Sequence, residues 1–145
     1  MTLILILSLF TLQLTPKEAI PVNTQKSTIA WEGGSATTTH NGLIGLKSGS
    51  LEISDGKLTG GTFEVDMTTI TNLDVSEAYR GKLENHLKSE DFFDAKAFPS
   101  AHLVIIKTTA ENENRYRIVA DLTIRNITKA IEFNATLSPI GNDYE

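Results

Sequence analysis

An alternation of apolar and polar residues runs through most of the chain after Pro21, and it limits the possible folds more than any other feature. In the clearest run, Phe63, Val65 and Met67 point to one side, while the acidic residues between them point to the other. A period of two residues is typical of a β-strand with one buried face. An antiparallel sheet with one apolar face must curl into a barrel or pack against a second sheet.

Two further alternating runs, at 116–124 and 131–137, lie close together toward the C-terminal end. Residues 125–128 turn the chain between them, so we predict an antiparallel hairpin. The Asp55-Gly56 pair predicts another hairpin turn. These signals together predict an all-β protein.

The alternation is interrupted once, by an insert that we place at about 77–94. Tyr79, Leu83 and Leu87 are four residues apart, which predicts a helix over 77–88 with one apolar face packed inward. This is the one helix that the sequence predicts in the domain.

The second half of the insert is rich in phenylalanine. Ser89, followed by two acidic residues, resembles a helix N-cap, so we expect a second short helical turn that carries Phe92 and Phe93. Together with Phe98, these rings would form a large apolar patch if they were all exposed to water. They therefore cap a core, line a cavity, or do both.

Four segments of the chain resemble a known family. Residues 86–94, HLKSEDFFD, resemble the HL-x-S-x-D-FFD signature of the YceI-like family, and residues 121–129 resemble its LTI-x-G-x-T-K turn. Residues 27–31 and 60–67 resemble its opening strand and its GG-x-F-x-VDM strand. The resemblance covers about 22–137. It implies a bacterial periplasmic protein with a lipocalin-like antiparallel β-barrel that holds polyisoprenoid lipids.

The sequence departs from this family pattern in two respects. Asn126 and Ala130 stand where the family usually has Gly and Pro, but Asn tolerates a left-handed backbone, so the turn is still expected. The chain also stops at Glu145, before the strands that normally close the family's barrel. We therefore expect an incompletely closed barrel in which 131–137 is an edge strand, and such an edge favours a homodimer.

The first residues differ in character from the rest. Residues 1–14 are almost wholly apolar, about as long as the core of a signal peptide and too short to span a bilayer. We expect a signal peptide at 1–20 and a YceI-like lipid-binding barrel domain at 21–145. Localisation would then be periplasmic or secreted, with no stable membrane span after signal removal. The alternative is that the apolar run is a buried strand or helix of the mature fold.

Composition and spacing exclude several kinds of function. Thirteen basic against eighteen acidic residues give a net charge of −5, so nucleic acid is not an expected partner. The absence of cysteine excludes disulfides and thiolate chemistry.

His86, Glu84, Asp91 and Asp94 are close in sequence, but helical spacing puts His86 and Asp91 on different faces. Ser89 lies too close along the same turn for a catalytic triad. We predict no metal, no cofactor and no catalysis, and we interpret His86 as a partly buried hydrogen-bonding residue.

The sequence thus predicts a non-catalytic binding protein. A barrel of about eight strands can hold one small ligand, and the resemblance implies that it is a polyisoprenoid lipid or an isoprenoid quinone, sequestered or transported. One alternative is a secreted β-domain that binds a protein partner through its surface; another is a hydrolase that uses the acidic insert. The candidate residues of the lumen and mouth are Trp31, Phe63, Val65, Met67, Leu83, Leu87, Phe92, Phe93, Ile118, Leu122, Ile131 and Phe133.

Overall fold

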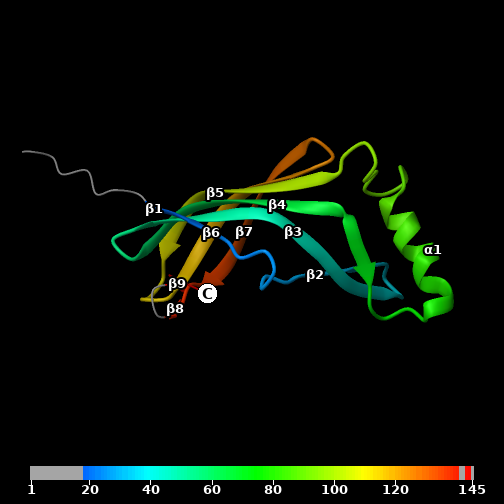
Figure 1. Ribbon diagram of the computed structural model, residues 1–145, viewed down its shortest axis with the longest axis horizontal. Helices are drawn as coiled ribbons and strands as arrows, with labels where there is room; N and C mark the ends of the chain where they lie inside the picture. The colour runs from blue at the N-terminus through cyan, green and yellow to red at the C-terminus, as the bar shows by residue number, and fades with distance from the viewer. Residues whose placement is uncertain (1–17, 141–142, 145) are drawn as a thin grey trace, which may run out of the picture.

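The computed structural model describes residues 18–140 and 143–144 (Figure 1). Within these residues the elements are, in chain order, β1 (Glu18–Pro21), β2 (Ile29–Gly34), β3 (Thr39–Ser54), β4 (Lys57–Asn72), α1 (Glu77–Lys88), β5 (Ser100–Ala110), β6 (Arg115–Ile124), β7 (Ile127–Thr136), β8 (Pro139–Ile140) and β9 (Asp143–Tyr144).

Seven of the described strands form one antiparallel sheet, in the order β1-β3-β4-β5-β6-β7. Strand β2 also pairs with β3, beyond the part that β1 covers. Strands β8 and β9 form a separate small ladder. Figure 1 shows α1 at one end of the long β3–β4 ladder, away from β8 and β9. The predicted antiparallel architecture with one helical insert is confirmed.

The sheet is open in the part of the chain that the structure describes. Strand β7 pairs with β6 and with no other described strand, so it is an edge, as the sequence predicts. At the other end of the sheet, β1 and β2 lie along the same side of β3. The described strands therefore curve without closing into a barrel.

Both predicted hairpin turns are present, and both use left-handed backbone. Asp55 and Gly56 have φ values of 50° and 71°, and Arg125 and Asn126 have values of 50° and 59°. Two consecutive residues with positive φ are typical of the tight turn that matches the twist of a hairpin. Asn126 thus adopts the left-handed backbone that we expect from the sequence at this turn.

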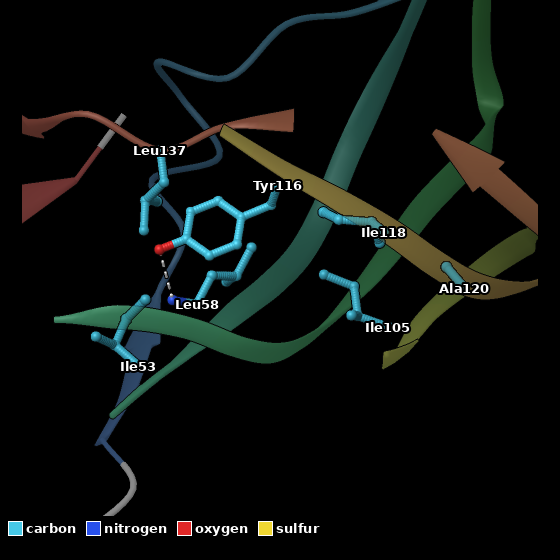
Figure 2. Packing of buried hydrophobic residues seen from close by; sticks show 7 residues of the cluster. All are labelled: Ile53, Leu58, Ile105, Tyr116, Ile118, Ala120 and Leu137. Carbon is cyan, nitrogen blue, oxygen red and sulfur yellow. Dashed lines mark hydrogen bonds between the residues drawn. The ribbon is translucent and has the colours of Figure 1, made fainter. Parts of the chain in front are cut away.

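The main core lies around the β3–β4 turn and the start of β6. Figure 2 shows Tyr116 and Ile118 of β6 packed with residues from β3, β4 and β5. The Leu58 amide donates a hydrogen bond of 3.4 Å to the Tyr116 hydroxyl, so this ring is buried with its polar atom satisfied. The cluster comprises Ile53, Leu58, Ile105, Tyr116, Ile118, Ala120 and Leu137.

A second, smaller cluster lies under the insert. Met67 of β4 and Ala101 of β5 pack with Ala95, which belongs to the loop after α1. Val65 and Phe93 pack around them. Through this cluster the loop is held on the apolar face of the sheet.

The first half of the insert differs from its prediction at Tyr79. The helix runs over Glu77–Lys88 and buries Leu87, as predicted, but Tyr79 is 66% exposed. The helix contacts β4 through its second half, where Glu84 accepts a hydrogen bond from Asn72 and Leu87 is buried. Tyr79 precedes that half, so the buried apolar face is shorter than the sequence predicts.

The predicted second helical turn is not formed. Ser89 ends α1, and its hydroxyl donates to the His86 carbonyl at 2.8 Å instead of capping a new helix. Asp94 adopts a φ of 47°, and its amide donates to the Ser89 carbonyl at 2.7 Å, so the segment closes as a loop. The prediction of a partly buried His86 is also wrong, because this side chain is exposed and lies with its ring centroid 6.2 Å from that of Phe92.

The predicted signal peptide falls mostly outside the described residues. Positions 1–17 are not described, while Glu18 to Ile20 pair with β3, so these three residues belong to a strand of the sheet. The position of a cleavage site stays a prediction. None of the described helices is long and apolar enough to cross a membrane.

Candidate functional site

A pocket of about 480 Å³ lies between the β6–β7 hairpin and the loop that follows α1. Most of its lining is aliphatic or aromatic, and a few charged side chains stand among these residues. The lining residues are Asp91, Phe92, Phe93, Leu122, Ile124, Arg125, Ile127, Lys129 and Ile131.

The register of β6 and β7 explains the apolar floor of the pocket. Leu122 pairs with Lys129, and Ile124 pairs with Ile127. Residues directly opposite each other in an antiparallel pair point to the same face. Ile131, two residues beyond Lys129, is on this face as well. The floor is thus built from alternate residues of two neighbouring strands.

The loop after α1 is fixed over this floor by Arg125. One guanidinium nitrogen, Nη1, donates to the carbonyls of Glu90 (3.1 Å) and Phe92 (2.8 Å). The guanidinium carbon also lies 5.8 Å from the centroid of the Phe98 ring, within cation–π distance. The hairpin turn and the insert therefore position each other.

Two aromatic rings of that loop form one wall. The rings of Phe92 and Phe93 meet edge to face with centroids 4.8 Å apart. Phe93 is half-buried and also packs against the Met67 cluster, whereas Phe92 is 48% exposed. Phe92 thus stands at the rim and Phe93 deeper in the wall.

The structure brings four of the predicted ligand-binding residues together in this pocket: Phe92, Phe93, Leu122 and Ile131. Phe133 pairs with Ile118 and so shares the apolar face, but it lies outside the pocket lining and is 36% exposed. Whether any of these residues touches a ligand stays a prediction.

The other predicted residues of the sheet belong to the packed interior. Ile118 is 2% exposed in the main core, and Phe63 packs against that core. Met67 and Val65 belong to the small cluster behind Phe93. None of these side chains lines the pocket.

Trp31, Leu83 and Leu87 also lie outside the pocket lining. The two leucines are on α1, which packs on β4. The Trp31 indole donates to the Thr71 carbonyl at 3.0 Å and covers Gly42, where a side chain would collide with it. These three residues hold β2, β4 and α1 together.

Sequence reasoning missed the other five lining residues, Asp91, Ile124, Arg125, Ile127 and Lys129. The alternation of β6 reaches Ile124, and the alternation of β7 extends backward from Ile131 through Lys129 to Ile127. The charge of Lys129 hid that continuation. Asp91 and Arg125 are in a loop and a turn, where no periodicity places a side chain.

The strongest electrostatic effects lie elsewhere. Glu64 accepts hydrogen bonds from the Lys47 ammonium and the Ser100 hydroxyl, both at 2.7 Å, and these lower its pKa to about 2. It lines a second surface depression of about 530 Å³, which His102 also lines. A carboxyl group with so low a pKa is poorly suited to acid–base catalysis near neutral pH. No group of three or more His, Cys, Asp or Glu that could hold a metal occurs among the described residues.

An antiparallel sheet with one apolar face, a helix-and-loop insert over one end and a pocket beneath that insert defines the class of lipocalin-like β-proteins. The sequence model described as the YceI-like domain matches residues 21–143. The chain belongs to the YceI-like family.

Curated relatives are bacterial proteins named UPF0312. The chain is 35% identical over 74 residues to one from Photorhabdus laumondii, which is 51% of this chain and 36% of that protein. It is 30% identical over 95 residues to one from Pseudomonas putida, which is 66% of this chain and 47% of that protein. The chain thus spans less than half the length of these two relatives.

Solved structures show the same fold. Burkholderia cenocepacia BcnA superposes with a TM-score of 0.69 at 18% identity, over 83% of this chain and 73% of BcnA. A YceI protein of Campylobacter jejuni gives a TM-score of 0.51 at 15% identity, over 97% of this chain and 67% of that protein.

Proposed function

We propose that the chain binds a long apolar amphiphile, a polyisoprenoid lipid or an isoprenoid quinone, on the apolar face of β6 and β7. It would sequester or carry this ligand without chemical change, in the periplasm or as a secreted protein. The pocket is the observation that carries the proposal: its volume of about 480 Å³ is within the range of small-molecule sites. Each ligand methylene buried there would contribute about 0.8 kcal/mol.

Membership of the YceI-like family supports this ligand class. The wall residues Phe92 and Phe93 are part of the segment at 86–94 that resembles the family's signature, so this segment supplies one side of the pocket. A motif that served packing alone would not need to leave Phe92 nearly half exposed.

Organic extraction of the purified protein, followed by mass spectrometry, tests the proposal directly. We expect a long-chain isoprenoid compound in the extract, or its uptake when it is added to protein that lacks it. An extract without apolar compounds, together with no uptake, would favour the alternative of a secreted β-domain that binds a protein through its surface.

A pair of variants tests the position of the ligand. Ile131→Trp fills the pocket and should reduce uptake severalfold, because the ligand and the indole compete for the same volume. Val104→Trp adds the same ring on the opposite face of the sheet, since Val104 pairs with Asp121 while Leu103 pairs with Leu122. The Val104 variant should bind like the wild type.

We further propose that the edge strand β7 pairs with a second copy of the chain. The observation that favours this is its apolar exposure: Ile127 is 63% and Phe133 36% exposed on a strand that has one described partner. Unpaired strand edges are templates for association.

A further inference from the structure

The charged residues of the pocket are distributed unevenly. Lys129 points to the apolar face of the sheet, opposite Leu122 and between Ile127 and Ile131 along β7. Arg125 adds a second cation at the turn, and Asp91 is the one carboxylate among the lining residues. In a chain of net charge −5, this mouth carries a local excess of positive charge.

These cations retain the capacity to bind an anion. Within the described residues, Lys129 has neither an ion pair nor a hydrogen bond to its ammonium group. Arg125 uses Nη1 for the loop carbonyls, which leaves the donors on Nε and Nη2 available. Asp91 also has no ion pair there, so the carboxylate does not neutralise either cation by direct contact.

The geometry suits an amphiphile. The aliphatic stem of Lys129 can lie along the apolar floor while its ammonium group stays at the opening. A ligand whose chain occupies the floor would then bring its head group to the ammonium and the guanidinium. Hydrogen bonds between charged partners are stronger than neutral ones, so the head group that gains most is an anion.

We infer that the ligand is a monomeric amphiphile with an anionic head group, a phosphate or a carboxylate, which Lys129 and Arg125 bind at the mouth of the pocket. This inference rests on the proposed function and narrows its ligand class. Among isoprenoid compounds, it favours prenyl phosphates over neutral quinones and alcohols.

Two probes that share one hydrocarbon tail, geranylgeranyl phosphate and geranylgeraniol, test whether the site prefers an anionic head group. Each is titrated by equilibrium dialysis below its critical micelle concentration. The phosphate should bind about tenfold more tightly, the effect of one charge-assisted contact. Its advantage should shrink as salt is raised, because exposed charges are screened.

Three variants locate the effect. Lys129→Gln should weaken binding of the phosphate about tenfold and change binding of the alcohol by less than about twofold. Lys129→Arg should retain the preference because it keeps the charge. Lys107→Gln is the control: Lys107 is exposed and pairs with Val119, on the face opposite to Ile118.

The outcomes separate this inference from the proposed function. If geranylgeraniol binds as tightly as the phosphate, or Lys129→Gln weakens both equally, the head-group assignment is wrong while the lipid site stands. If Lys129→Gln alters only self-association, Lys129 protects the strand edge and the assignment is also wrong. If neither probe nor any other amphiphile binds, both proposals fail. Binding to anionic vesicles without uptake of monomeric lipid would overturn the inference in favour of a membrane surface.

Discussion

Asn72, the last residue of β4, connects the sheet to the insert. It is 1% exposed, and its side-chain amide donates to the Asn41 carbonyl at 3.0 Å and to Asp74. Its side-chain oxygen accepts from the Val75 amide at 2.8 Å, and its backbone amide donates to Glu84 of α1, also at 2.8 Å. A single buried residue thus satisfies groups from three segments, through its side-chain amide and its backbone amide.

We expect Asn72→Ala to lower the free energy of unfolding by about 1–3 kcal/mol, since it leaves the Val75 amide without its partner and removes one of the two hydrogen bonds to the Asn41 carbonyl. Denaturant unfolding measures this change. Asn134→Ala, an exposed position on β7, is the matched control and should change stability by less than about 0.5 kcal/mol. Equal effects would show that the network contributes little.

Asp74 makes part of the stability depend on pH. A hydrogen bond from His40 Nδ1 (2.9 Å), and then one from the Asn41 amide, lower its pKa from 3.8 to about 2. A lowered carboxyl pKa stabilises the folded state above about pH 4, and this contribution is lost as the pH falls toward about 2.

The melting temperature of Asp74→Asn should therefore lie below that of the wild type at pH 5–7, and the difference should shrink between about pH 4 and pH 2. Glu64, whose pKa is also lowered, is present in both proteins, so its effect cancels in the comparison. A difference that stays constant down to pH 2 would contradict the role of the Asp74 charge.

At the scale of elements, the β6–β7 hairpin is both the floor of the pocket and an edge of the sheet. Its inward face supplies the floor, its turn holds the insert through Arg125, and its outer edge has no described partner. The same strand therefore serves the proposed ligand and the proposed association.

A charge added to this edge should weaken self-association. We expect Asn134→Lys to shift the protein toward monomer in light scattering, because like charges would meet across the paired edges. Gln25→Lys adds the same charge in the turn before β2 and should leave association unchanged. The proposed pairing of this edge is wrong if the wild type is a monomer and its backbone amides at 131–137 exchange hydrogen with solvent as slowly as those at 63–67.

At the scale of the whole molecule, one apolar face is divided between packing and a pocket. Near the β3–β4 turn it is filled by the Tyr116 cluster, and toward the insert it is left open beside Phe93. Stability and binding should therefore depend on different residues along the same strands.

Phe93→Ala should reduce uptake of an isoprenoid probe severalfold. Removing a fully buried ring typically lowers the free energy of unfolding by about 3–5 kcal/mol, and this substitution should cost less because Phe93 is half-buried. Tyr79→Ala is the control, because it removes an exposed ring of α1 that lies outside the pocket lining, and it should leave uptake unchanged. Parallel binding and unfolding measurements separate the two effects; loss of stability without loss of uptake would make Phe93 a core residue alone.

The sequence alone determined the long strands of the sheet, the two hairpin turns, the helix and the family, but not the short strands β1, β8 and β9. These features depend on local signals: alternation in 116–124 and 131–137, residues that tolerate positive φ at Asp55-Gly56 and Asn126, and the apolar spacing that ends at Leu87. Each is encoded within a few neighbouring residues, so no tertiary contact is needed to find it.

Only the tertiary structure decided which apolar residues fill the core and which line a pocket. Ile118 and Leu122 are indistinguishable by periodicity, because an inward residue has the same spacing whether it meets a side chain or an open space. The difference arises from what lies opposite, the Leu58–Tyr116 packing in one case and the loop held by Arg125 in the other. The face on which Lys129 lies follows from its spacing from Ile131, but only the structure shows that the loop after α1 forms a pocket with it there.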